Sequence, residues 1–430
     1  MRGIRIGICV LLAFSVVAQG AVEPWSEAVL EIGAALLFLW WGLLGLFASG
    51  TVPTLRWNWL LAPLAGLWAF AIIQYLTGLT AMRFLTKIEI LKFSALLILS
   101  FLAVQAYQTL GHWRGFVWFL LALGFFVSVF GILQHFTFNG KMYWFQELRY
   151  GGIPFGPYVN RNHFAGLIEL IVPTGLSILV LRAEERDRMP LLTLLTLVPI
   201  GALFLSASRG GIVSVFVEVG LVMILAVRLR RGRNQLVAGA VVLLLAGGLA
   251  AWLGVGPALD RFAKYRALEA TEARRAELRR DTWRIFLEHA IVGTGLGTFE
   301  SVFPRYETLY DGNVVEHAHN DYVEALAETG MIGGILCMTF LALLFRQNWL
   351  RLAHANSSMA LAFHIGSGVA CCGILIHSFV DFNLHIPSNA LLFLLQAVLA
   401  TSLISSNWAV PVAYREDTGK SPVVITTESV

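Results

Sequence analysis

Charged residues are scarce in this chain of 430 residues. Only 13% are Asp, Glu, Lys or Arg, whereas 57% are hydrophobic, and the mean hydropathy is +0.72. No soluble fold of this length needs so much apolar surface, so the soluble globular class is excluded. The net charge of +4 is too small to indicate a nucleic-acid partner. The composition therefore predicts a polytopic membrane protein embedded in a lipid bilayer.

Cysteine is also rare. The four cysteines, Cys9, Cys337, Cys371 and Cys372, lie inside apolar runs and show neither the paired spacing of secreted proteins nor a CxxC ligand pattern. We expect them to pack as small hydrophobic side chains. A disulfide framework and a cysteine metal site are therefore disfavoured.

Long apolar runs dominate what remains. A helix needs roughly 20 mainly apolar residues to cross a bilayer, and by this measure the chain has about twelve transmembrane helices, which predicts an all-α fold. The expected spans are residues 4–21, 27–48, 57–78, 88–107, 115–135, 163–182, 191–207, 210–228, 236–254, 329–346, 359–380 and 389–406.

Basic residues in short loops set the orientation, because cytoplasmic loops carry an excess of Lys and Arg. Arginines of this kind flank alternate ends of the expected spans: Arg2, Arg5, Arg182, Arg186, Arg188, Arg228, Arg230, Arg231, Arg233, Arg346 and Arg351. An even number of spans then places both termini in the cytoplasm. The N-terminus also has signal-peptide features, with small residues near Ala18 and Ala21. We favour an uncleaved first helix, because the second span follows almost immediately.

This topology predicts four parts. Residues 1–254 form about nine transmembrane helices and include an outer loop at 136–162. Residues 255–328 form a large, partly helical outer loop, and residues 329–407 form about three more spans. Residues 408–430 are a polar tail that we expect to be cytoplasmic and disordered. The two outer loops are longer than connectors need to be.

Two histidines stand beside an expected span in the segment His317–Tyr322. Imidazole exchanges a proton near neutral pH, so this segment is the first candidate for chemistry. Asp321 and Glu324 fit a capping box with Gly330 as a helix stop, which is a structural alternative for the segment. Capping does not account for His317 or His319, although each could be a structural histidine. Metal ligation is disfavoured, because no carboxylate cluster of the zinc or magnesium type lies nearby in the sequence.

Arginines also occur on the expected outer side, where the orientation rule gives no reason for them. Arg209 lies between two spans, and a charge at membrane depth costs roughly 2.5 to 3.5 kcal/mol. We expect it to face a cavity; an arginine that reaches lipid headgroups is the alternative. The helical segment 269–289 aligns Arg275 with Arg279 and Arg280 with Arg284. A solvated helix with salt bridges is the alternative there.

A third polar group lies just before the expected span at 163–182. It consists of Asn160, Arg161, Asn162 and His163. One of the two asparagines could simply be the N-cap of the helix. Arg161 is harder to explain structurally, because it adds one more positive charge on the outer side.

These motifs resemble the O-antigen ligase and Wzy-type polymerase superfamily of bacterial envelope glycosyltransferases. The family's outer-loop signature is matched by His319-Asn320, nine residues to Thr329, then Gly330 and Gly333. Other stretches that resemble the family follow in chain order: Pro154–Gly166, Ser206–Gly210, Gly293–Phe299 and His377–Pro387. The resemblance covers most of residues 120–400.

The resemblance implies a membrane glycosyltransferase with a GT-C-like fold in the bacterial inner membrane, with its active site facing the periplasm. Its donor would be a glycan on undecaprenyl diphosphate, and no cofactor or essential metal is implied. The acceptor hydroxyl would belong to a lipid A core sugar in a ligase, or to another lipid-linked glycan in a polymerase. A polymerase would also work with a chain-length regulator protein. We favour the polymerase or a general polysaccharide-assembly role.

The resemblance also implies site residues. His319 is the base or the group that orients the hydroxyl, and Arg209 and Arg275 bind the diphosphate. In the family, an arginine commonly precedes a tryptophan-containing helix that leads into the Gly-rich run, and counting back from this run at 293–297 selects Arg275. The family's usual tryptophan then falls on Arg279. If this count is displaced, Arg280 is the alternative to Arg275. Further candidates for substrate contact are Arg161, Asn160, His163, His317 and Asn320. The chemistry agrees, since guanidinium groups fork onto phosphate oxygens and neutral imidazole accepts a proton.

Two other classes of protein remain as alternatives. A secondary transporter would place its charged residues at the membrane midplane and often shows internal repeats, neither of which the sequence displays. A structural membrane protein would leave the outer histidines and arginines without a purpose.

Overall fold

The computed structural model describes residues 1–47, 55–148, 154–230, 272–310, 312 and 314–404. The expected span at 236–254, the first part of the 255–328 loop and the tail at 408–430 therefore lie outside the described residues. Within the described ranges the chain is helical, and its extended pairing is limited to two isolated bridges, Met142 with Gln146 and Phe155 with Tyr158.

The all-α prediction is confirmed. The helices of at least four residues are α1 (Arg2–Val17), α2 (Pro24–Phe47), α3 (Leu61–Thr77), α4 (Arg83–Ala106), α5 (Leu110–Phe136), α6 (Arg161–Leu181), α7 (Met189–Ser206), α8 (Arg209–Arg230), α11 (Glu272–Glu288), α12 (Phe299–Val302), α13 (Asp321–Ala353), α14 (Ser358–His377) and α15 (Pro387–Thr401). Among the described residues, eight helices are long and apolar enough to cross a membrane. The chain is a multi-pass membrane protein.

Every expected span except 236–254 coincides with a described helix, but the lengths differ. The structure ends α14 at His377 and begins α15 at Pro387, so the last three residues of the expected span 359–380 belong to the turn between these helices. Helix α1, with 16 residues, α3, with 17, and α15, with 15, are shorter than a full crossing. These shorter apolar helices accompany the eight longer ones, and the described helices agree with the expected polytopic all-α architecture.

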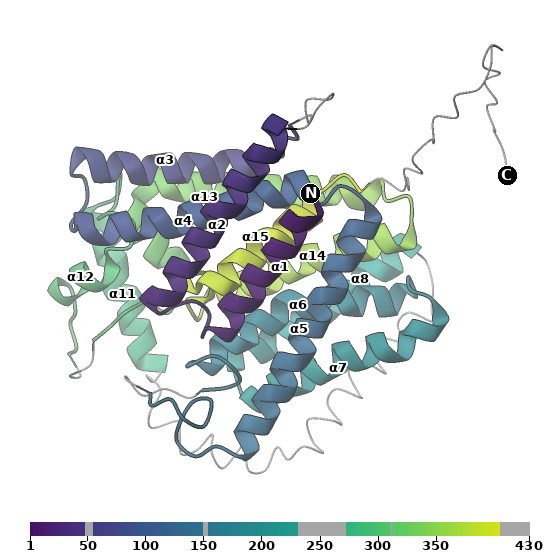
Figure 1. Ribbon diagram of the computed structural model, residues 1–430. Helices are drawn as coiled ribbons and strands as arrows, with labels where there is room; N and C mark the ends of the chain where they lie inside the picture. Colours follow the sequence, from purple (N-terminus) through teal and green to yellow (C-terminus); the bar gives the residue numbers. More distant parts are fainter. Residues whose placement is uncertain (48–54, 149–153, 231–271, 311, 313, 405–430) are drawn as a thin grey trace, which may run out of the picture.

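Helix α6 is the centre of the bundle, and nearly all of its residues are buried. Helix α14 packs along it, and α7, α8 and α15 cover other sides (Figure 1). Small residues permit this close approach, because a Cβ on Gly366 would lie 2.3 Å from Thr174 Cα. Helix α2 differs from α6, because most of its surface is exposed, as expected for a helix that faces lipid.

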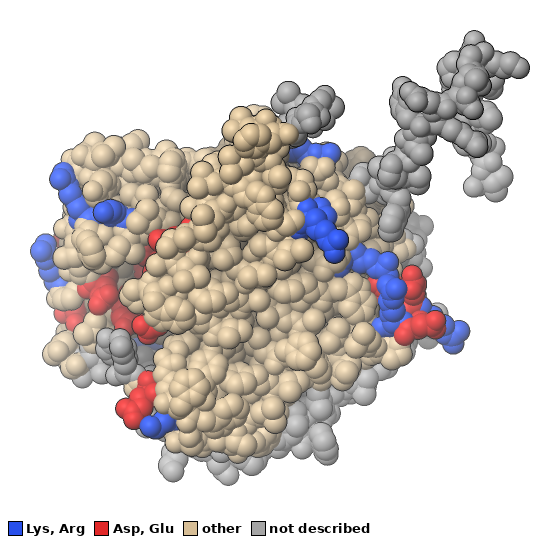
Figure 2. Space-filling model, viewed as in Figure 1, with Lys and Arg blue, Asp and Glu red and all other residues tan. Residues whose placement is uncertain are grey.

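The basic ends of the helices meet on one side of the bundle. Arg5 Nη1 donates to Ala106 O at the end of α4, and Arg351 Nε donates to Thr401 O at the end of α15. Charged side chains lie toward the ends of the helices, with a broad uncharged band between them (Figure 2). This band is the surface expected to contact acyl chains. The starts of α6, α8, α13 and α15 lie on the side opposite the basic ends.

Helix α13 contains a break that separates this opposite side from the membrane part. Gly330 has φ 60° and ψ −161° inside the helix. A Cβ at this residue would lie 2.4 Å from Ile291 O, so the neighbouring loop approaches too closely for a side chain. The expected stop at Gly330 is therefore seen as a break between two helical segments, the first of which begins at Asp321.

Candidate active site

The connection between α14 and α15, residues 378–386, collects the histidines of the site. Phe382 lies at its centre, and three imidazole rings pack against this one side chain. Their centroid distances from Phe382 are 4.7 Å for His163, 4.3 Å for His317 and 5.0 Å for His319. Residues from the start of α6, from the segment before α13 and from the α14–α15 connection therefore meet at one point.

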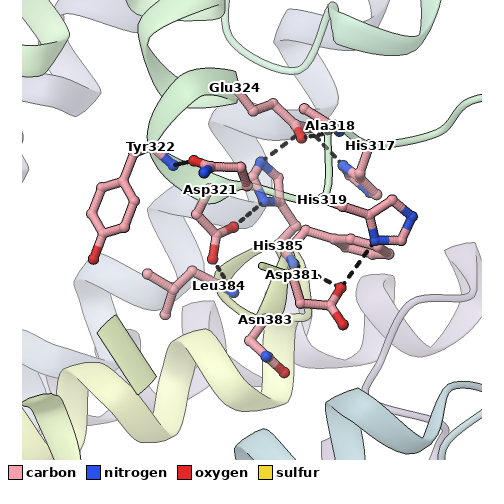
Figure 3. Close-up of polar contacts among 12 residues, drawn as sticks. His317, Ala318, His319, Asp321, Tyr322, Glu324, Asp381, Asn383, Leu384 and His385 are labelled. Atoms are coloured by element: carbon pink, nitrogen blue, oxygen red, sulfur yellow. Dashed lines mark hydrogen bonds and ion pairs between the residues drawn. The ribbon is translucent and has the colours of Figure 1, made fainter. Parts of the chain in front are cut away.

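His319 is oriented by Asp381. Its Nδ1 lies 3.3 Å from Asp381 Oδ1, and a quarter of its side chain remains exposed while Asp381 is buried (Figure 3). Burial would raise the pKa of Asp381, but the hydrogen bond from His319 and electrostatic interactions with His319, His163 and His377 hold that pKa well below its usual range. An ionised carboxylate can only accept, so Nδ1 of His319 donates and Nε2 carries the lone pair.

Asp381 is itself fixed from a second helix. Asn162 Nδ2 donates to Asp381 Oδ2, and the backbone N of Phe382 donates to Oδ1 over 2.9 Å. Asn162 is held at the start of α6, where Asn160 is the N-cap and accepts from the Asn162 backbone N at 2.9 Å. The N-cap alternative thus applies to Asn160, whereas the Asn162 side chain joins the site.

A second imidazole–carboxylate group lies beside the first (Figure 3). His385 Nδ1 is 2.7 Å from Asp321 Oδ1, and its Nε2 is 3.3 Å from Glu324 Oε1. Glu324 Oε1 is also 2.7 Å from His317 Nδ1. Burial alone would lower the pKa of His385, but Glu324 and Asp321 raise it to about 10. His385 is therefore an imidazolium that forms a hydrogen bond with Asp321 and an ion pair with Glu324.

The same atoms form the group that could hold a metal ion. One ligand atom each from His317, Glu324 and His385 lies within 4.8 Å of the others. The sequence shows no carboxylate cluster of the zinc or magnesium type beside the histidines, and the fold brings Glu324 and His385 to His317. In the hydrogen-bonded arrangement these atoms already satisfy one another, and Ala318 N donates to Glu324 Oε2 at 2.7 Å.

The capping box that the sequence indicated is wrong in its register. Asn320 is the N-cap of α13, and its Oδ1 accepts from the backbone N of Tyr322 and of Val323, both at 3.0 Å. Its Nδ2 donates to Phe379 O at 2.9 Å. Both ends of the Asn320 amide are engaged, so this residue ties α13 to the α14–α15 connection.

Two of the expected arginines approach the same connection. Arg275 on α11 donates from Nη1 to Val380 O at 3.3 Å. Arg209 is the first residue of α8 and is exposed. The next residue, Gly210, lies against the connection, because a Cβ there would be 3.1 Å from Val380 Cγ2 and 2.5 Å from His377 Nε2. Val380 directly precedes Asp381, so the Arg275 guanidinium and the start of α8, where Arg209 lies, both approach the turn that holds the partner of His319.

The remaining candidates differ in their surroundings. Arg280 is exposed on α11, and no contact joins it to the connection within the described residues. Arg161 is buried at the first position of α6. His163 is buried too, and its Nε2 has no hydrogen-bond partner among the described groups, while its backbone O accepts from Asn389 Nδ2 at 2.9 Å.

Sequence reasoning assigned no role to Asp381, His385, His377 or Glu169. The first three lie in the His377–Pro387 stretch, where three ionisable side chains precede a span. This grouping is the sequence signal that could have identified them. Glu169 gave a weaker signal as a single acid within an apolar run. The structure pairs it with His377, whose Nδ1 is 2.8 Å from Glu169 Oε1, with both side chains fully buried.

One known protein family is similar to part of the chain. The O-antigen ligase family model matches residues 193–338, a stretch that includes Arg209, Arg275 and His319 and ends before His377. No curated protein matches the chain. Residues 193–338 therefore match an O-antigen ligase domain, which supports the resemblance of the chain to the O-antigen ligase and Wzy-type polymerase superfamily.

Proposed function

We propose that the protein transfers a glycan from a polyprenyl diphosphate, undecaprenyl diphosphate in bacteria, to an acceptor hydroxyl, with His319 as general base. The observation that carries this proposal is the turn at Val380 and Asp381, where Asp381 holds His319, Arg275 donates to Val380 O, and the start of α8 next to Arg209 packs. A proton acceptor next to fixed cations is what this reaction needs.

In the reaction, the acceptor oxygen forms a bond to the anomeric carbon as the bond from that carbon to the diphosphate oxygen breaks. The hydroxyl proton passes to Nε2 of His319, and Asp381 stabilises the imidazolium that forms. The electron pair of the broken bond stays on the diphosphate. Arg209 and Arg275 are assigned to this leaving group, because guanidinium groups hold phosphate oxygens with paired N–H donors.

The position of the site relative to the membrane suits a lipid-linked donor. The site lies at the ends of the helices opposite the basic side, so a diphosphate at headgroup level can reach it while the polyprenyl tail stays among acyl chains. Because basic loops face the cytoplasm, we assign the site to the periplasmic side of the inner membrane.

The proposed transfer requires no metal ion. The arginines supply the positive charge that a divalent cation would otherwise provide to a diphosphate. His385, with a pKa of about 10, would have to lose a proton before it could bind a metal.

The direct test is transfer by the purified full-length protein in lipid nanodiscs, with an undecaprenyl-diphosphate-linked glycan as donor. Parallel reactions offer a lipid A core acceptor and a second lipid-linked glycan, which separates ligase from polymerase activity. We expect His319→Ala to abolish transfer. His354→Ala is the matched control, because His354 is an exposed histidine at the other end of α13. Full transfer by His319→Ala would exclude the proposed base.

Ion-coupled transport is the second candidate function, and one observation favours it. Glu169 on α6 and Glu218 on α8 are fully buried carboxylates inside membrane-spanning helices, where ionisable groups often mark ion paths. Reconstituted liposomes with an imposed proton gradient distinguish the two functions. Proton flux that Glu218→Gln removes would support transport, whereas glycan transfer without flux supports the transferase.

A further inference from the structure

A cavity lies on the same side of the bundle as the histidine site but outside that site. Its volume is about 310 Å³, near the lower end of the roughly 300 to 1,000 Å³ found for small-molecule sites. The turn between α1 and α2 forms one wall, and the segment after α5 forms the other. The cavity is lined by Gln19, Glu23, Trp25, Met142, Gln146, Glu147, Leu148 and Val159.

Its polar groups offer both hydrogen-bond donors and acceptors. Gln19 Nε2 donates to Gln146 Oε1 at 2.6 Å, which links the two walls. Within the described residues, the other ends of these two amides and the carboxylate of Glu23 make no hydrogen bond. Two amides and a carboxylate suit neighbouring hydroxyl groups, because each hydroxyl both donates and accepts.

An aromatic side chain borders these polar groups. Trp25, at the start of α2, is 60% exposed, and Phe14 packs against its edge with ring centroids 5.9 Å apart. An indole face stacks well on the apolar C–H surface of a pyranose ring. Polar groups beside an exposed aromatic ring therefore match the two surfaces of a sugar better than they match an acyl chain.

The backbone around the cavity is strained. Within the described chain, four residues other than glycine on its two walls have positive φ: Gln19 at 61°, Ala21 at 61°, Tyr143 at 52° and Trp144 at 65°. Such conformations persist where surrounding structure imposes them, and they concentrate at binding sites. His319, at 51°, shows the same feature at the candidate active site.

The cavity is joined to the active-site elements by direct bonds. Ser388 N, at the start of α15, donates to Gly20 O at 3.0 Å, and Tyr158 Oη lies 2.8 Å from Ser388 Oγ. Val159, in the cavity wall, directly precedes Asn160, the N-cap of α6. A glycan held at the histidine site could therefore extend toward this cavity.

A tryptophan at a membrane interface can also be a simple anchor. Anchoring accounts for Trp25 but not for the linked glutamines or for Glu23, which an anionic headgroup would avoid. Glu147, the second acid of the cavity, forms an ion pair with Lys141 at 3.1 Å, whereas Glu23 has no such partner among the described residues.

We propose that this cavity is a carbohydrate subsite for one neutral or amino pyranose unit of the glycan. The proposal rests on the proposed function for the identity of the glycan, but binding at this cavity does not require transfer. Uronic acids are expected to be excluded by the carboxylate of Glu23.

The test is saturation-transfer-difference NMR on the full-length protein in nanodiscs, with N-acetylglucosamine, glucose and glucuronate as separate probes. We expect signals from the ring protons of the first two sugars and a weak signal from glucuronate. Trp25→Ala should weaken sugar binding about 3- to 10-fold, as expected for the loss of one stacking contact. Glu23→Gln should raise the glucuronate signal.

Two controls keep the result specific. Trp59→Ala removes another exposed tryptophan, 67% exposed, near the start of α3 on the basic side, and should leave the signals unchanged. His319→Ala should also leave them unchanged, so a failure of the proposed transfer chemistry is read separately from a failure of the subsite. The proposal is overturned if neither neutral sugar gives a signal, or if Trp25→Ala and Trp59→Ala behave alike.

Discussion

His319 and Asp381 lie 62 positions apart in the chain, yet the Nδ1 of His319 is 3.3 Å from Asp381 Oδ1. The pairing joins the segment before α13 to the turn after α14. It fixes which imidazole nitrogen carries the proton, and it leaves the other nitrogen for a substrate. The candidate base thus depends on a contact between two turns that α13 and α14 separate in the sequence.

Asp381→Asn tests this pairing. A general base contributes roughly 100- to 10,000-fold to the rate, and an amide at residue 381 no longer stabilises the imidazolium. We expect a loss of kcat within this range and little change in KM for the donor. The double variant with His319→Ala should transfer no less than His319→Ala alone, since both residues act as one unit. Additive losses would show separate roles.

Arg209→Ala and Arg275→Ala test the diphosphate assignment. A hydrogen bond to a charged group contributes about 1.5 to 3 kcal/mol, so each variant should lose at least about 10-fold in kcat/KM for the donor. Arg280→Ala, on the same helix as Arg275, is the matched control and should stay near wild type. Equal losses in Arg275→Ala and Arg280→Ala would indicate a general charge effect of α11, or a role for Arg280 in place of Arg275.

Gly210→Ala tests the packing beneath Arg209. The added Cβ would lie 2.5 Å from the His377 ring, which Glu169 holds in place. We expect destabilisation of about 1 to 3 kcal/mol and reduced transfer, because the start of α8 must shift. Gly220→Ala, on the same helix with no atom within 4 Å, should cost nothing. Thermal unfolding in detergent measures both, and equal stability of the two variants would contradict the contact.

The His385 network predicts a pH dependence of stability. The pKa of His385 is about 10 in the folded protein, above its ordinary value of about 6.5. The folded state therefore binds the extra proton between these values, and its stabilisation is complete below about pH 6.5 and lost as the pH rises toward 10. The unfolding temperature of the wild type should fall over this window more than that of His385→Gln. Parallel curves would remove His385 as the cause.

Metal independence is tested with a chelator. EDTA should leave transfer by the purified protein unchanged, because a metal at His317, Glu324 and His385 would compete with the proton of His385. Elemental analysis of the washed protein provides a second measurement. Activity that EDTA removes and a divalent ion restores would assign the cluster to a metal.

The sequence predicted the helices well because each span is long and apolar, a signal that needs no tertiary information. The end of the span expected at 359–380 was less accurate, because Phe379 and Val380 are apolar yet lie in the turn after α14. Their hydropathy matches that of a helix, whereas their turn holds the partner of His319.

The site was predicted only in part. His317 and His319 stand out because two imidazoles beside a span lack a structural reason. Asp381 and His385 lie in a stretch that resembles the family, but the sequence assigns them no roles. Their partners, Asn162 and Asp321, come from the distant helices α6 and α13. Glu324 had a local explanation as a capping residue, and this explanation concealed its contact with two histidines. Roles that arise from contacts between distant segments leave no periodic pattern in the sequence.

The break at Gly330 has a consequence for the lipid environment. Residues before it are bonded to the histidine site, and residues after it run through the hydrocarbon layer. The break gives the two segments separate axes. The membrane segment can therefore tilt to match a thicker or thinner bilayer. The segment from Asp321 to Thr329 keeps its contacts with the histidine site during this tilt. The site is thereby insulated from variation in bilayer thickness.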